Sequence, residues 1–274
     1  MFDNIEAVNK IQSQWVFSIV ILLGLIESLV LLIKNKTGNQ KGSILSLICG
    51  FLAFIPMIVL NKVVLFSLMI WLYNHSLFHF EHNMYSWILT FYITHIISHK
   101  IRFFWCIHSV HHTSEEMKLT SGMRGSIFDF IYLPFVILWI PFLGIHPIYL
   151  ITVESFTRLY GFYVHISEDL IKKQPYLEFL IITPSSHRVH HGINKQYIDK
   201  NFGEVLSIWD HLFCTWQSEK DKPIYGLAKK IDSNDFKSIQ FSEFIELFND
   251  IKSAEKVIDK FRYLYKQPNW KHKF

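Results

Sequence analysis

Charged residues are scarce in this chain. Only 18% of its 274 residues are Asp, Glu, Lys or Arg, against about 25% in an ordinary soluble protein. Half of the residues are hydrophobic, and 25 of them are phenylalanine. The net charge is only +4 and no basic stripe follows the chain, so we expect no nucleic-acid-binding surface. This composition is typical of a membrane protein.

The motifs of common hydrolases are also missing. No Gly-x-Ser-x-Gly sequence is present, which argues against a hydrolase with a nucleophile elbow. No His-Glu-x-x-His sequence is present, which argues against a zinc protease. The chain has three cysteines, Cys49, Cys106 and Cys214. Because they lack the close spacing of a metal site, we expect them to be reduced, buried and structural.

Long apolar segments fill much of the N-terminal two thirds of the chain. Residues 15–33, interrupted only by Glu27, have about the length that a bilayer requires. The chain begins with Asp3 and Glu6 instead of basic residues, so this segment is predicted to be a retained helix and not a signal peptide. Further apolar segments cover residues 43–60, 63–73, 84–97, 127–143 and 145–164.

The distribution of charge and proline predicts a topology. The loop after the first segment carries Lys34, Lys36 and Lys41, and the positive-inside rule places such a loop in the cytoplasm. Segments 127–143 and 145–164 are predicted to cross out and back, with kinks or breaks at Pro134, Pro141 and Pro147. We expect an all-α integral membrane bundle of about four or five spanning helices with a cytoplasmic, histidine-rich helical cap.

Histidine is abundant, and eight of the fifteen histidines fall into three tight clusters. The clusters are His95 and His99; His108, His111 and His112; and His187, His190 and His191. Residues three and four positions apart share one face of a helix, so each cluster is predicted to present its imidazoles to one point. Neutral imidazole binds iron, zinc, copper and nickel. Eight imidazoles are too many for one tetrahedral ion and suit two metal ions held close together.

Three further residues are candidates to support such a site from behind the ligands. His79 shares a helical face with His75, although an isolated histidine in an apolar helix is more often a packed residue. Asp210 is predicted either to accept a hydrogen bond from a ligand imidazole or to cap the helix that contains His211. Glu115 is predicted either to orient a histidine or to begin a helix. No catalytic residue is expected beyond the metal ligands.

Three regions are predicted along the chain. Residues 1–82 form a membrane anchor, residues 83–218 contain the histidine clusters, and residues 219–274 form a charged cytoplasmic tail. In the tail, mixed polar and apolar patterns at 241–248 and 254–265 predict one or two short amphipathic helices.

The histidine pattern resembles that of the fatty acid hydroxylase and sterol desaturase superfamily of membrane di-iron proteins. The signature is a His-x-x-x-His box followed by two His-x-x-His-His boxes, and the resemblance covers about residues 84–228. Within the superfamily the chain looks most like the alkylglycerol monooxygenase branch, as residues 183–192 (T-P-S-S-H-R-V-H-H-G) indicate. Three positions depart from the usual pattern: Ile96 replaces an arginine, Ser186 a histidine and Cys214 a glycine.

The resemblance implies a ligand set and an activity. It implies that the eight clustered histidines coordinate two iron ions, with His165 as a ninth ligand. It also implies that O2 is activated and one oxygen atom inserted into a C–H bond of a lipid. In the alkylglycerol branch this carbon lies beside an ether oxygen and tetrahydrobiopterin supplies electrons; a redox protein is the other candidate donor. The alternatives are a desaturase or sterol-type oxidase with the same metal centre, or a non-catalytic membrane zinc protein.

Overall fold

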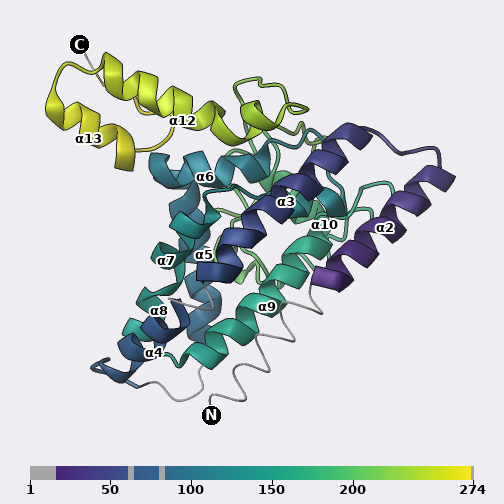
Figure 1. Ribbon diagram of the computed structural model, residues 1–274. Coiled ribbons are helices and arrows are strands. Elements are labelled where there is room, and N and C mark those ends of the chain that lie inside the picture. The colour runs from purple at the N-terminus through teal and green to yellow at the C-terminus, as the bar shows by residue number, and fades with distance from the viewer. Residues whose placement is uncertain (1–16, 61–64, 80–83, 273–274) are drawn as a thin grey trace.

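The computed structural model describes residues 17–60, 65–79 and 84–272, and these residues form helices joined by loops (Figure 1). The exception to helix and loop is an isolated antiparallel bridge between Ile181 and Leu206. The prediction of an all-α chain is therefore confirmed for the described part. The first residues of the predicted apolar segments 15–33 and 63–73 lie outside the described residues.

Four long helices follow the predicted apolar segments. They are α2 (Phe17–Ile33), α3 (Gln40–Leu60), α5 (Met84–Lys100) and α9 (Pro147–Val164). The first residue of α9 is Pro147, and the first position is where a helix best tolerates proline. The preceding residue, His146, caps the helix, because its side chain accepts a hydrogen bond from the Ile148 N–H at 3.2 Å.

The predicted break in residues 127–143 is present. This segment forms two short helices, α7 (Asp129–Ile137) and α8 (Trp139–Phe142), with Pro134 inside the first and Pro141 inside the second. Helix α4 (Phe66–Asn74) packs against α8 and α9. A cluster of buried apolar side chains, including Met69 and Ile140, fills the space between these helices.

The spanning helices expected from hydropathy are not identified by the structure. Across residues 17–60, 65–79 and 84–272, no helix combines the length and the apolar character that crossing a bilayer demands.

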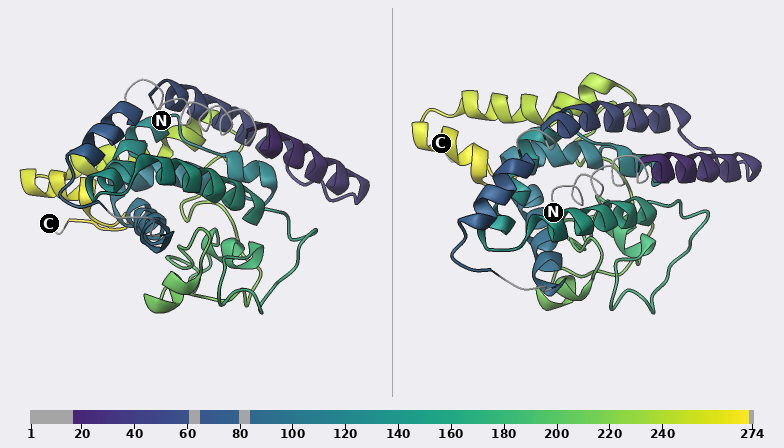
Figure 2. Two further views of the ribbon diagram at one scale, coloured as in Figure 1. Left: turned by 90° about the horizontal axis from the view of Figure 1, so that it is seen from below. Right: turned by 60° about the horizontal axis from the view of Figure 1, so that its bottom comes forward.

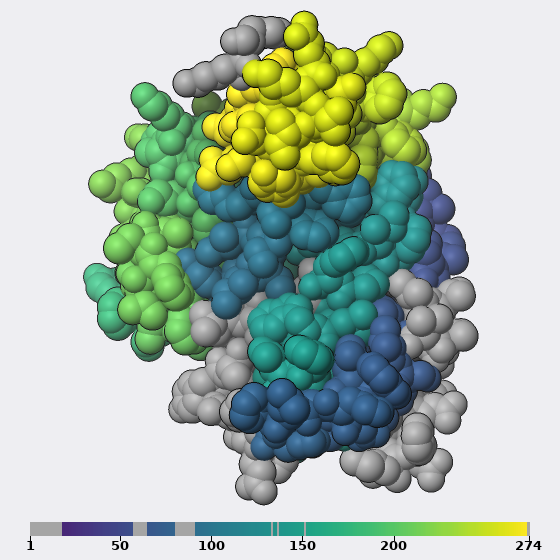
Figure 3. Space-filling model, turned by 90° about the vertical axis from the view of Figure 1, so that its left-hand side faces the viewer, coloured from purple at the N-terminus to yellow at the C-terminus, as the bar shows by residue number. Residues whose placement is uncertain are grey.

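The C-terminal region is a packed helical hairpin. Helix α12 (Phe236–Ser253) includes the predicted segment 241–248, and α13 (Val257–Tyr265) covers the predicted segment 254–265 from its fourth residue onward. Asp235 caps α12 by accepting a hydrogen bond from the Ser238 N–H at 2.7 Å. Both helices contact α6 (Arg102–His112), with Cys106 and Leu247 in the shared core, and Figure 3 shows them in yellow on one end of the molecule.

The remaining region, residues 166–228, consists mainly of loops with two short helices, α10 (Pro184–His190) and α11 (Ile208–Leu212). Figure 2 shows this region, in green, on the side of α9 that faces away from α3. One cysteine prediction is wrong here: Cys214 is exposed, whereas Cys49 and Cys106 are buried. The loop after α11 turns outward at Cys214, which has a left-handed backbone with φ of 58°.

Candidate metal centre

Nine histidines lie together as two adjacent groups. One group has five members: His95, His99, His108, His112 and His190. The other has four: His111, His165, His187 and His191. Within each group, one ring nitrogen per histidine lies within 4.8 Å of the others. The structure thus brings together all eight histidines of the three clusters and also His165.

The groups divide the histidines differently from the sequence clusters. In the second cluster, His108 and His112 belong to the five-histidine group, whereas His111 belongs to the four-histidine group. The third cluster is divided too, because His190 separates from His187 and His191. The expectation that each cluster points at one site is therefore wrong for two of the three. Residues three and four apart share a broad helix face, and that face spans both groups.

Four helices hold the nine histidines. Helix α5 carries the first cluster, α6 the second and α10 two residues of the third, while His191 and His165 are the C-caps of α10 and α9. Helix α10 begins as its sequence predicts: Thr183 caps it by accepting the Ser186 N–H at 3.2 Å, and Pro184 occupies the first turn. Gly122, in the 3-10 helix η3 (Leu119–Met123), lets that helix approach His165, since a Cβ there would lie 3.0 Å from its Nδ1.

The four-histidine group has the spacing of ligands around one ion. His165 Nε2 lies 3.1 Å from His111 Nε2, 3.2 Å from His191 Nε2 and 3.1 Å from His187 Nε2. Two nitrogens bound to one ion at about 2.1 Å are about 3.0 to 3.4 Å apart, depending on the angle at the metal. The observed distances fall within this range, so the donor set fits a transition metal.

Backbone carbonyls orient three of the imidazoles from behind. His95 Nδ1–H donates to the Phe202 carbonyl at 2.8 Å, His190 Nδ1–H to Lys200 at 3.0 Å, and His165 Nδ1–H to Gly161 at 2.6 Å. A proton on Nδ1 leaves the Nε2 lone pair facing the group, which is the arrangement of a metal-ligating histidine.

Several inward-facing nitrogens have no protein partner. Among the described residues, the Nε2 atoms of His99, His112 and His190 are buried without a hydrogen-bond partner. Leaving a buried polar atom unpaired is costly. Three such atoms in one group are explained if a metal ion is their partner, and this is a second sign that the residues fit a metal.

Burial keeps these imidazoles neutral. Removal from water lowers the pKa of His108, His112 and His187 well below the ordinary value of 6.5, and repulsion from neighbouring histidines lowers it further. Burial also lowers the pKa of His165 to about 4. Metal binding needs the neutral form, so at neutral pH the site requires no deprotonation before it binds an ion.

Asp210 supports the site through the backbone, which differs from both predicted roles. Its buried carboxylate accepts the Phe202 and Gly203 N–H groups, each at 2.7 Å, and the Thr215 hydroxyl at 2.7 Å. None of these three hydrogen bonds comes from a histidine of the two groups, and Asp210 lies inside α11, which begins after Ser207. The Phe202 carbonyl orients His95. Asp210 therefore positions that histidine indirectly, by holding the backbone of Phe202.

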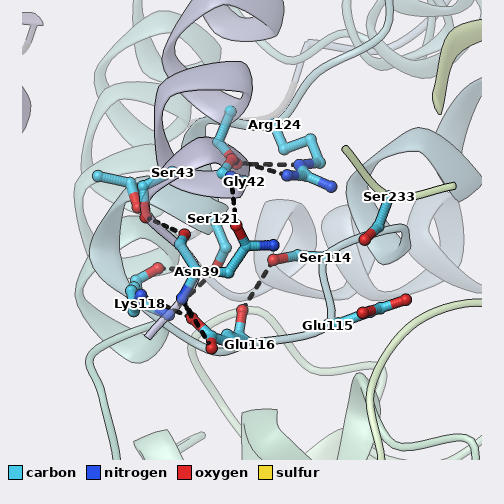
Figure 4. A pocket seen from close by; sticks show the side chains of 12 residues that line it. Asn39, Gly42, Ser43, Ser114, Glu115, Glu116, Lys118, Ser121, Arg124 and Ser233 are labelled. Carbon is cyan, nitrogen blue, oxygen red and sulfur yellow. Dashed lines mark hydrogen bonds and ion pairs between the residues drawn. The ribbon is translucent and has the colours of Figure 1, made fainter. Parts of the chain in front are cut away.

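Glu115 and His79 lie apart from both groups. Glu115 is exposed and lines a polar pocket between α3 and the loop after α6, together with Arg124 (Figure 4). Arg124 donates to Ser46 Oγ at 2.9 Å and to the Gly42 carbonyl at 2.8 Å, so it ties η3 to α3. His79 is exposed, with its ring 4.7 Å from that of Tyr73. None of the described contacts joins Glu115 or His79 to the nine histidines, so a supporting role for either residue stays a prediction.

Glu27 connects the elements around His165, and its position in an apolar segment of the sequence does not predict this role. Its carboxylate is buried and accepts the Leu119 N–H at 2.6 Å and the Ser167 N–H at 2.9 Å. These bonds join α2 to η3 and to the loop that follows His165. The only sequence signal is the charge itself, which is costly in an apolar environment unless it is paired.

An all-helical protein with a double cluster of buried histidines defines a class of metal-binding, histidine-box proteins. The family model for fatty acid hydroxylase matches residues 83–215, which contain all three clusters. Residues 83–215 therefore form a fatty acid hydroxylase domain, and the resemblance predicted from the boxes is confirmed.

The chain is similar to alkylglycerol monooxygenases over most of its length. It is 30% identical to that of Homo sapiens over 93% of this chain and 58% of the relative. It is 32% identical to that of Danio rerio over 98% of this chain and 62% of the relative. The chain thus spans about three fifths of the length of these relatives. It is also 26% identical to the ornithine lipid hydroxylase OlsE of Rhizobium tropici, over 46% of this chain and 38% of the relative. No solved structure matches the chain.

Proposed function

We propose that this chain is a membrane-bound di-iron oxygenase that uses O2 to hydroxylate a C–H bond of a lipid. The observation that carries the proposal is the pair of adjacent histidine groups, with five and four inward-facing imidazoles. The names of the relatives support the substrate class, because an alkylglycerol and an ornithine lipid are both lipids. The proposed ligands are the nine histidines of the two groups.

The chain's own residues prepare the site for this chemistry. Two iron ions, when bound, would supply the capacity to activate O2 and accept electrons. The imidazoles are neutral, so the ions keep their positive charge. The aromatic rings of Trp105 and Phe202 lie 5.1 Å and 5.2 Å from the ring of His99. They cover the five-histidine group with apolar surface, which excludes water from a reactive centre.

The membrane placement is part of the proposal. Outward-facing side chains on α2 and α3 are apolar and largely exposed, among them Leu25 at 61%, Ile33 at 72% and Phe51 at 55%. Exposed apolar surface on neighbouring helices is typical of a membrane contact. We propose a multi-pass integral membrane protein whose metal site lies on the cytoplasmic side, since the lysines between α2 and α3 favour that side.

The proposed reaction is hydroxylation at the carbon beside the ether oxygen of an alkylglycerol-type lipid, with tetrahydrobiopterin or a redox protein as the electron donor. The test supplies iron-loaded protein with an ether lipid and O2, with and without tetrahydrobiopterin, and follows the products by mass spectrometry. A gain of one oxygen atom supports the proposal. Loss of two hydrogens identifies a desaturase instead.

Metal analysis tests the centre independently of the substrate. The two groups lead us to expect about two iron ions per chain. A stable zinc content with no O2 consumption after iron loading would show a non-catalytic zinc protein and would contradict the proposed oxygenase.

A further inference from the structure

We infer that the loop region behind the metal centre carries a second lipid-contacting surface, separate from α2 and α3. We call it the outer apolar surface, formed by Tyr176, Phe179, Leu180, Ile208, Leu212 and Phe213. These six apolar or aromatic side chains are all exposed, by 45% to 96%. The inference rests on the proposed membrane placement and adds a contact made by the histidine-bearing domain itself.

In the first segment of this surface, residues 176–180, apolar side chains face outward and the charged side chain faces inward. Tyr176, Phe179 and Leu180 are 96%, 65% and 59% exposed, whereas Glu178 between them is only 4% exposed. The Glu178 carboxylate turns inward and accepts hydrogen bonds from the Ser185 and Thr183 hydroxyls. In a loop surrounded by water, the opposite orientation is expected, because a charged side chain is rarely buried. The outward environment of this segment is therefore apolar.

Helix α11 repeats the same inversion. Ile208 and Leu212, four residues apart and on one helix face, are 45% and 64% exposed. Asp210 on the same helix is fully buried with its carboxylate bound to backbone N–H groups. Two unrelated stretches of sequence thus both turn their carboxylate inward and their apolar side chains outward.

The two segments form one continuous surface. Leu180 accepts a backbone hydrogen bond from Ser207 at 3.1 Å, and the Phe179 ring lies 5.2 Å from that of His211 in α11. Residues at both segments also pack against the long helices. Phe213 stacks on Tyr92 of α5, with ring centroids 5.4 Å apart. Tyr160 of α9 donates to the Ile182 carbonyl, next to the first segment, at 2.6 Å.

A lipid bilayer is the occupant that fits these features. The surface adjoins α5 and α9, which belong to the proposed membrane helices, so it would extend their proposed lipid contact. Exposed Lys172 and Lys173 precede the first segment. Aromatic and leucine side chains beside lysines are the composition of a segment that lies in the headgroup region of a bilayer. This surface would place the histidine groups beside the leaflet, where a lipid reaches them without crossing water.

The test measures the environment of single labelled positions in the full chain. Exposed Cys214 is first replaced, as Cys214→Gly, because glycine adopts its left-handed backbone without strain. An environment-sensitive fluorophore is then attached to Phe179→Cys in protein reconstituted into phospholipid nanodiscs. The matched control is Phe248→Cys on α12, since Phe179 and Phe248 are both 65% exposed. Leu25→Cys on α2 reports on the proposed membrane helices.

Quenchers in the lipid and in the water distinguish the outcomes. We expect the label at Phe179 to lose most of its emission to doxyl-labelled lipid and little to iodide, with the reverse at Phe248. Equal iodide quenching at both positions overturns the inference. Protection at Phe179 from both quenchers also overturns it, because a protein partner would then cover the surface. If Leu25 is quenched by lipid and Phe179 is not, only this inference fails; if neither is, the proposed membrane placement fails. Iron content, measured on the same samples, reports on the metal centre separately.

Discussion

Individual histidines contribute unequally to the two groups, because one group has five members and the other four. His165→Ala leaves three imidazoles in its group, whereas His99→Ala leaves four in the other. Four imidazoles complete a tetrahedral site and three do not. We expect His165→Ala to lose about half of the bound iron and His99→Ala to retain most of it. Metal analysis of the two purified variants checks this, and equal loss would contradict the division into groups.

The sequence predicts which histidines gather but not how they are divided. Spacing places His108, His111 and His112 on one helix face, and that remains true in α6. Their division between two groups depends on where α10 and the end of α9 approach that face, which no local pattern records. His165 has no neighbouring histidine within its own sequence segment, so resemblance to the family was the only sequence signal for it.

Substituting Asp210 tests how much the metal centre depends on a residue that orients a ligand without binding the metal. Asp210→Asn keeps the shape but removes the charge that three donors share at 2.7 Å. Hydrogen bonds to a charged group contribute about 1.5 to 3 kcal/mol each, so we expect a clearly lower melting temperature. We also expect weaker iron retention, because Phe202 orients His95.

Asp169→Asn provides the control for this substitution. Asp169 forms only a partly exposed ion pair with Lys36 at 3.9 Å, and such pairs contribute about 0 to 1 kcal/mol. A melting temperature for Asp210→Asn equal to that of the control would show that the buried carboxylate does not support the loop.

Glu204 makes stability depend on pH. Burial raises the pKa of its carboxyl from 4.5 to about 7, so folding disfavours the charged form. Its contribution to stability is complete below pH 4.5 and is lost as the pH rises through 7. We expect Glu204→Gln to match the wild type at pH 4.5 and to be more stable at about pH 8. Denaturant unfolding at both pH values measures this, and parallel pH profiles for the two proteins would refute it.

Among the elements, α6 is joined to α12 by a buried arginine. Arg102 at the start of α6 is buried and lies 3.4 Å from Asp250 and 3.9 Å from both Glu243 and Glu246 of α12. Removing one partner of a buried ion pair costs about 3 to 5 kcal/mol. We expect Arg102→Met to destabilise the protein by about this amount and to lower iron content, because α6 carries three of the ligands.

Lys229→Met is the matched test of whether burial matters. Lys229 pairs with Glu246 at 3.0 Å but is 68% exposed, so its loss is expected to cost no more than about 1 kcal/mol. Thermal unfolding of both variants, with iron analysis, compares them. Equal effects would mean that the hairpin does not hold α6 through Arg102.

The C-terminal hairpin shows that an amphipathic pattern predicts helices but not the element against which they pack. Residues 241–248 and 254–265 predict helices, and α12 and α13 are present. A charged composition suggests a solvated tail, yet α12 contributes Leu247 and α13 contributes Tyr263 to a core with Cys106. Packing against a distant helix requires complementary surfaces in two elements, and hydropathy along one element cannot show it.

At the scale of the whole molecule, the two histidine groups join segments that are far apart in the chain. Residues from α5, α6, α10 and the end of α9 meet there, yet each contributes only a few side chains. Without metal, the inward Nε2 atoms of His99, His112 and His190 lack partners, and unpaired buried polar groups are destabilising. Binding energy at such a site is therefore also folding energy.

Removing the metal is expected to loosen this centre before the rest of the molecule. Chelation should lower the melting temperature and increase amide hydrogen exchange most in α10, which carries proposed ligands, and in the loop at Phe202, whose carbonyl orients His95. Helix α4 and its core with Ile140 and Leu150 contain none of the nine histidines, so its exchange should change little. Hydrogen exchange measured by mass spectrometry, before and after chelation and after iron is restored, tests this. A uniform increase across α4 and α10 would show that the metal stabilises the fold globally and would contradict a local role.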